Sequence, residues 1–168
     1  MAEFYLETVG RADVTLKRAM EGLTDAELRQ QVAGPQSNPI GWLVWHLTRT
    51  RDSIVANFSG TKTLWETEWA AKLGMDANPP QYKPEDVHTF DPKSVDLLMG
   101  FFGAVEKHTA DIVGKLNDAD LERMVQPMVQ GRPPASVAAR LGVILNDNIQ
   151  HIGQVAYLRG MLREQGWF

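Results

Sequence analysis

Apolar residues recur at intervals of three and four along most of the chain, a spacing that places them on one face of an α-helix. Four long segments carry this pattern: residues 3–22, 39–58, 92–116 and 134–164. In the first segment the apolar positions are Phe4, Leu6, Val9, Val14, Leu16 and Met20. None of the segments alternates apolar and polar residues as half-buried strands do. The pattern therefore predicts an all-α protein built as a four-helix bundle.

Residues that favour helix ends mark the predicted boundaries. Asn38 and Asp91 each precede a proline, and a capping residue followed by proline at the first helical position is a common helix start. Thr24 and Glu27 have the spacing of a capping box, in which each residue satisfies a backbone amide of the other. This spacing predicts a short helix or turn at about residues 25–32.

A long connection separates the second and third predicted helices. It contains the short amphipathic stretch LWETEWAAKL and then the turn-rich stretch GMDANPPQYKP. Trp65 and Trp69 fall on one face of the short stretch, and we expect them to pack against the bundle rather than to contact a ligand. A connection of this length in a small protein is usually functional or covers a site.

Composition favours one domain over residues 1–168. The chain has 168 residues, of which 43% are hydrophobic, and this is enough for one sizeable core. The net charge is -4 and the 17 basic residues are scattered, so we expect no binding to nucleic acid. No apolar run is long enough for a membrane span or a signal peptide, which predicts a cytoplasmic protein without a membrane partner.

The chain contains no cysteine. This excludes disulfides, a protein thiol nucleophile and zinc bound by thiolates. Any metal must be held by His, Asp or Glu side chains. If the chemistry uses sulfur, the thiol comes from another molecule.

Asp147 and His151 form the first candidate site. They are one helical turn apart, with Cβ atoms about 5–6 Å from each other, and they follow the apolar stripe of Ile144, Val155 and Leu158. A carboxylate on a buried face needs a compensating charge, which a divalent cation supplies. The spacing alone is a weak signal, because a simple ion pair or hydrogen bond between Asp147 and His151 also explains it.

His46 is the candidate for a third ligand. It lies in a strongly apolar helical segment beside Leu43 and Leu47, so we expect it to point inward. A lone histidine there would more often belong to the core, but the pair on the last helix favours a shared metal site. His88 and His108 have polar neighbours and are expected to be surface or loop side chains.

Two stretches of sequence together resemble the DinB-like superfamily, also called DinB/YfiT-like metalloenzymes. They are PIGWLVWHLTRTRDSI and, about a hundred residues later, HIGQVAYLRGML. Their order and spacing extend the resemblance over essentially the whole chain. The resemblance implies a four-helix bundle in which three histidines bind a divalent metal, often zinc or nickel. His46 and His151 match two of these ligands, whereas Asp147 stands where the common pattern has histidine. This set also suits manganese or iron.

Members of the superfamily resemble thiol S-transferases and mycothiol-dependent maleylpyruvate isomerases. The resemblance therefore implies a metal-dependent transferase or isomerase that acts on a small molecule with a low-molecular-weight thiol, such as mycothiol, bacillithiol or glutathione. A metal with open positions binds such a thiol as the more nucleophilic thiolate. The replacement at Asp147 leaves an alternative open, a non-catalytic module that binds a small molecule or acts in a stress response. No catalytic residue is assigned.

Other polar residues on the last helix complete the prediction. Gln154 can reach the face of the ligands and support them, and Asn148 lies at the edge of that face. Arg159 is expected either to hold an anionic substrate or to extend along the bundle rim. A homodimer is also expected, because related bundles often pair, although the sequence does not locate an interface.

Overall fold

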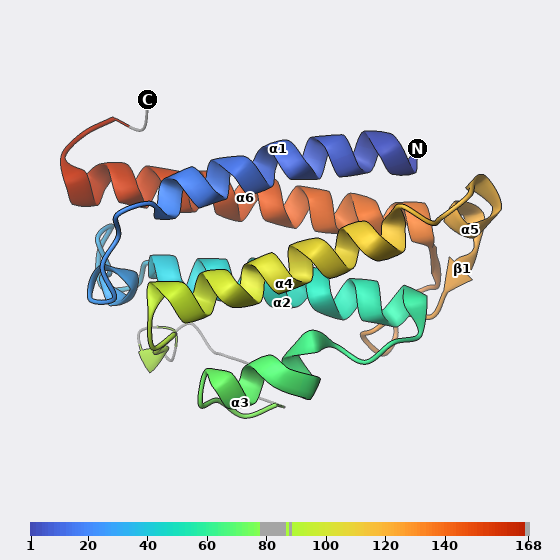
Figure 1. Ribbon diagram of the computed structural model, residues 1–168, viewed down its shortest axis with the longest axis horizontal. Helices are drawn as coiled ribbons and strands as arrows, with labels where there is room; N and C mark the ends of the chain where they lie inside the picture. The colour runs from blue at the N-terminus through green and yellow to red at the C-terminus, as the bar shows by residue number, and fades with distance from the viewer. Residues whose placement is uncertain (78–86, 88, 167–168) are drawn as a thin grey trace.

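A computed structural model describes residues 1–77, 87 and 89–166 of the chain (Figure 1). Its four long helices are α1 (Ala2–Met20), α2 (Ile40–Ser59), α4 (Val95–Val113) and α6 (Val137–Arg163). The shorter elements are the 3-10 turn η1 (Glu27–Arg29), the π-helical turn η2 (Trp65–Trp69), α3 (Ala70–Lys72), α5 (Asp118–Glu122) and the two-residue strands β1 (Met124–Val125) and β2 (Ala135–Ser136). The strands pair antiparallel.

The four long helices lie side by side as a bundle, with α1 and α6 running in one direction and α2 and α4 in the other (Figure 1). Helix α2 packs against both α6 and α4. Because α2 and α4 are parallel, the chain must return along the bundle between them, and η2 and α3 lie on this return. The predicted all-α four-helix bundle with a long connection between its second and third helices is confirmed. No described helix is long and apolar enough to cross a membrane.

The two tryptophans of the connection are core residues, as predicted. Trp65 is 1% exposed and Trp69 is 9% exposed. Their rings lie 5.4 and 5.8 Å from the ring of Phe101 on α4. The connection is further fixed by Asp52 of α2, whose buried carboxylate accepts the backbone amides of Leu64 and Trp65 at 3.0 and 2.9 Å. The first part of the return path, through Trp69, is therefore part of the folded core.

Asn38 and Asp91 were predicted to cap helices that begin at the following prolines, and both predictions are wrong. Helix α2 begins at Ile40 and no side chain caps it, so Asn38 is not its N-cap. Helix α4 begins at Val95, where the Ser94 hydroxyl accepts the amide of Leu97 at 3.2 Å.

Asp91 instead accepts the backbone amide of Lys93 at 3.0 Å. The backbone at Lys93 is left-handed, with a φ of 68°, and this interrupts the helix that was expected to start at Pro92.

The buried face of α1 also differs from the prediction. Phe4 and Val14 are 65% and 54% exposed, whereas Tyr5 and Asp13 are buried. The pattern misplaced this face because a charged residue occupies one of its central positions. The predicted capping box is confirmed: the carboxylate of Glu27 accepts the amide of Thr24 at 2.7 Å, and the Thr24 hydroxyl accepts the amide of Glu27 at 3.4 Å.

Asp13 forms a buried ion pair with Arg51 of α2. Both residues are 1% exposed, and one guanidinium nitrogen lies 2.9 Å from each carboxylate oxygen. The Nε of Arg51 donates to the hydroxyl of Thr109 on α4 at 3.1 Å. One guanidinium therefore joins α1, α2 and α4.

Removing the carboxylate of this pair should strongly destabilise the bundle. We expect Asp13→Ala to lower the free energy of unfolding by about 3–5 kcal/mol, because Arg51 would remain charged and buried without a counterion. Unfolding in urea, followed by circular dichroism, measures the change.

The matched control is Glu106→Gln, which breaks the half-exposed pair with Lys17 that also joins α1 to α4. It should cost less than about 1 kcal/mol. Equal losses in the two variants would contradict a dominant role for the Asp13–Arg51 pair.

Candidate metal centre

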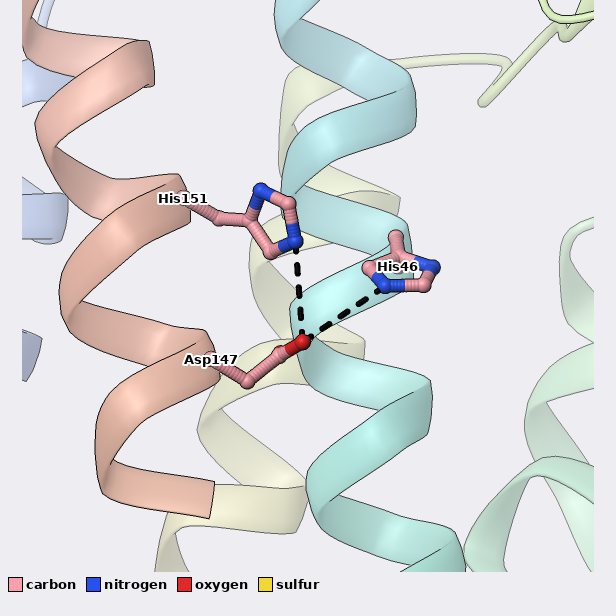
Figure 2. Close-up of side chains that lie close together, drawn as sticks. All are labelled: His46, Asp147 and His151. Atoms are coloured by element: carbon pink, nitrogen blue, oxygen red, sulfur yellow. Dashed lines mark ion pairs between the residues drawn. The ribbon is translucent and has the colours of Figure 1, made fainter. Parts of the chain in front are cut away.

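Helices α2 and α6 bring the three predicted ligands together. His46 projects from α2 toward α6, where it meets Asp147 and His151 (Figure 2). The Nε2 atoms of both histidines lie 3.6 Å from Oδ1 of Asp147. One donor atom from each side chain lies within 4.8 Å of the other two. The side chain of His46 is 36% exposed, and those of Asp147 and His151 are 19% and 18% exposed.

The spacing of these atoms fits shared ligation better than direct hydrogen bonding. At 3.6 Å, a nitrogen and an oxygen are too far apart for a hydrogen bond. Two ligands of one tetrahedral metal, each about 2.0–2.2 Å from the ion, are roughly 3.3–3.6 Å apart. The two distances from Asp147 to the histidines fit this range, whereas the set as a whole, with donor atoms within 4.8 Å, would have to contract around a cation.

Gln154 orients His151 for this role. Its amide oxygen lies 2.7 Å from Nδ1 of His151. An amide oxygen can only accept, so Nδ1 carries the hydrogen and, in the neutral ring, the lone pair is on Nε2, the atom that faces Asp147. This is the arrangement in which a metal-binding imidazole is usually held. Gln154, which the sequence predicted as a supporting residue, thus contacts His151.

Aromatic contacts position His46. Its ring stacks on Trp42, one turn earlier, with centroids 4.8 Å apart and planes at 12°. It also meets the ring of His151 edge-on at 4.9 Å. Stacking restricts rotation of the imidazole and leaves its Nε2 directed at Asp147 (Figure 2).

Asp147 is the electrostatic centre of the cluster. Its Oδ2 is buried and has no hydrogen-bond partner in the described part of the chain. Burial raises the pKa of Asp147, but the attraction of the two imidazoles outweighs burial, and the net pKa lies below the usual 3.8. The carboxylate beside His151 raises the pKa of that imidazole above 6.5, against the opposing effect of burial. A buried carboxylate oxygen without a hydrogen-bond partner, next to two imidazoles, suits the binding of a cation.

The remaining candidates lie outside the cluster. Asn148 is fully buried, and neither polar atom of its amide has a partner among the described residues. Arg159 lies two turns beyond His151, about 12 Å along the helix, and donates to the carbonyl of Glu21 at 3.2 Å. His108 is half-buried on α4, apart from the three ligands. His88 is outside the described residues.

A pocket of about 520 Å³ adjoins His46. It follows α2 toward its C-terminal end and is lined there by Arg49, with Arg132 and Arg140 contributed from the chain around the start of α6. These arginines were not predicted as site residues. Arg49 is one turn after His46 and Arg140 is two turns before Asp147, so the helical spacing contained a signal for both, whereas the loop residue Arg132 gave none.

The fold and the cluster define a helical-bundle protein with a candidate two-histidine, one-carboxylate metal centre. Residues 10–155 match the family described as the DinB superfamily, and the chain belongs to this superfamily. The structure is similar to the crystal structure of a conserved protein from Enterococcus faecalis, with a TM-score of 0.85 and 20% identity over 98% of each chain. At that identity the likeness shows the fold alone. No curated protein matches the chain.

The opposite pKa shifts predict how the metal-free cluster contributes to stability. The lowered pKa of Asp147 gives stability that is present above about pH 4 and is lost as the pH falls through the lower folded value. The raised pKa of His151 gives stability that is present below about pH 6.5 and is lost as the pH rises through the higher folded value. In metal-free protein, Asp147→Asn should therefore cost up to about 1 kcal/mol at pH 5.5 and less at pH 8.5. Urea unfolding at the two pH values measures this difference.

Asp111→Asn is the control, because the partner of Asp111 is Lys107 and not a histidine. Its effect should be the same at both pH values. A pH-independent effect of Asp147→Asn would contradict the predicted coupling.

Proposed function

We propose that the protein binds one divalent metal through His46, Asp147 and His151, and uses it to activate a low-molecular-weight thiol for transfer or isomerisation. The observation that carries the proposal is the convergence of two imidazole Nε2 atoms on one carboxylate oxygen at 3.6 Å. Membership of the DinB superfamily supports it. Mycothiol, bacillithiol and glutathione are candidate thiols.

The chemistry needs a thiol from outside, because the chain has no cysteine. A divalent metal with open positions lowers the pKa of a bound thiol from about 8.5 and so supplies a thiolate at neutral pH. The thiol proton leaves to solvent, sulfur forms a bond to an electrophilic carbon, and a leaving group departs with its electron pair. The protein's part is to hold the ligands in place, as Gln154 does for His151, and to position the electrophile.

Asp147 affects the choice of metal. A carboxylate in place of a third imidazole lowers the charge of the site by one and favours harder cations. Zinc and nickel suit the two imidazoles, and manganese and iron also accept this set of ligands.

Metal content tests the first part of the proposal. Purified protein should bind about one divalent ion per chain, and zinc, nickel or manganese should raise its melting temperature. His46→Ala and His151→Ala should each weaken binding by at least about 100-fold, since even the loss of a supporting residue around a metal costs about 10–100-fold. Elemental analysis and thermal unfolding measure these effects. His108→Ala, outside the cluster, should bind like the parent. A parent protein with neither metal nor a thermal shift would disprove the site.

Turnover tests the second part. The metal-loaded parent should consume at least one of the three thiols in the presence of a generic electrophile such as 1-chloro-2,4-dinitrobenzene, and His46→Ala should not. Loss of thiol is followed with a chromogenic disulfide reagent. Metal binding without turnover of any thiol would favour the non-catalytic module.

Replacing Asp147 by histidine tests its effect on metal preference. Asp147→His should raise the affinity for zinc relative to manganese, because a third imidazole replaces a hard oxygen ligand. Competition titrations of the two metals against a chromogenic chelator give the ratio of affinities. Asp111→His, on the exposed face of α4, serves as the control for an added histidine. An unchanged ratio in Asp147→His would show that residue 147 does not ligate the metal.

A further inference from the structure

The pocket beside His46 is unusual in charge. Its lining includes the guanidinium groups of Arg49, Arg132 and Arg140, and no lining residue in the described part of the chain carries a carboxylate. The protein as a whole has a net charge of -4. The charge of the pocket lining is therefore positive, opposite in sign to the net charge of the protein.

Several arginines elsewhere in the described part of the chain pair with a carboxylate. Arg51 pairs with Asp13, Arg29 with Asp91, and Arg163 with Glu27. Among the residues that the structure describes, neither Arg132 nor Arg140 forms an ion pair. Arg140 is half-buried and its Nε is buried without an acceptor among the described residues. Its hydrogen bond from Nη2 to the carbonyl of Gln126 is long, at 3.4 Å. Its hydrogen-bonding capacity is largely unused.

Arg49 is held in place by aromatic rings. Its guanidinium carbon lies 5.2 Å from the ring centroid of Trp45 and 5.1 Å from that of Trp65. A planar cation stacked in this way loses little further freedom when it binds an anion. Arg49 therefore adds a positioned positive charge to the pocket one turn from His46.

The antiparallel packing of α2 and α6 sets the length of the pocket. Residues after His46 on α2 lie beside residues before Asp147 on α6, and Arg140 precedes Asp147 by seven residues, about 10 Å along the helix. The pocket thus extends from a candidate metal ligand to a group of arginines. The lining also includes the apolar residues Ile54, Met128 and Val129.

We infer that this pocket binds a small anionic molecule, with its carboxylate or phosphate group on the arginines and its reactive end beside His46. Guanidinium groups bind both kinds of anion through short, charge-assisted hydrogen bonds. The volume suits a small organic ligand. The place of the reactive end rests on the proposed metal function, whereas the anion site rests on the arginines alone. The anion belongs either to the thiol or to its electrophilic partner.

The test begins with metal-free protein, so that a carboxylate cannot bind through the metal. Calorimetric titration with succinate, and separately with inorganic phosphate, should show binding to the parent that weakens as salt is added. The double variant Arg132→Gln/Arg140→Gln should bind the preferred anion about tenfold more weakly, through loss of charge-assisted hydrogen bonds. Arg18→Gln, which removes an exposed arginine of α1, should bind like the parent. Thermal unfolding verifies that each variant is folded.

Equal affinity in the parent and the folded double variant, or no binding of either anion to the parent, would overturn the inference. These titrations contain no metal, so their outcome does not depend on the metal proposal. Failure of the anion site can therefore be told apart from failure of the metal site.

A second comparison assigns the source of the anion in metal-loaded protein. Mercaptosuccinate has the carbon skeleton of succinate with one thiol added. Tighter binding of mercaptosuccinate than of succinate, lost in His46→Ala and weakened in Arg132→Gln/Arg140→Gln, supports the pocket and places the anion on the thiol. Equal binding of the two, still weakened in Arg132→Gln/Arg140→Gln, supports the pocket and places the anion on the electrophile. If metal-loaded Arg132→Gln/Arg140→Gln binds succinate and mercaptosuccinate as tightly as the metal-loaded parent does, the inference is overturned.

Discussion

The rest of the structure depends on a single buried guanidinium. Arg51 is bound by Asp13 of α1 and contacts Thr109 of α4, so the rotation of α2 about its axis is fixed by charge-assisted hydrogen bonds and not by apolar packing alone. Apolar contacts tolerate sliding, whereas a buried charge that loses its partner is costly. His46 lies on the same helix, five residues earlier, and its direction toward α6 follows from this rotation. No hydrogen bond joins the three candidate ligands themselves at 3.6 Å, so surrounding contacts must hold them.

The charged residues of α2 have two different roles. Some hold the fold together in the interior, and one lines the pocket of the candidate site. Arg51 and Asp52 face the interior and are satisfied there, Arg51 by neighbouring helices and Asp52 by the connection. Arg49 lines the pocket, with its guanidinium beside the rings of Trp45 and Trp65. The long connection therefore has a direct part in the site, because it supplies one of the rings that hold Arg49. Its length is explained by the parallel direction of α2 and α4, which obliges the chain to return along the bundle.

The sequence predicted most of the fold and the three residues that meet in the candidate site, because both depend on helical periodicity. His46, Asp147 and His151 could be identified since each lies on or beside an apolar stripe. The helix starts were harder to predict: Asp91 and Asn38 have the right chemistry, but the left-handed backbone at Lys93 and the nearby Ser94 decide where α4 begins. The buried position of Asp13 could not be read from α1 alone, since its partner lies on another helix. The arginines of the pocket likewise meet only once α2 and α6 are packed antiparallel.

The separation of the ligands along the chain has a consequence for biogenesis. Two ligands are on the last long helix and the third is on the second, so no short segment of the chain contains the complete set. In small metal-nucleated domains the ligands are close in sequence and the ion drives folding. Here a growing chain has only His46 until α6 has been synthesised and has docked on α2. Under the proposed function, metal would therefore be acquired late, after the bundle has assembled, and its binding would report on the completion of the fold.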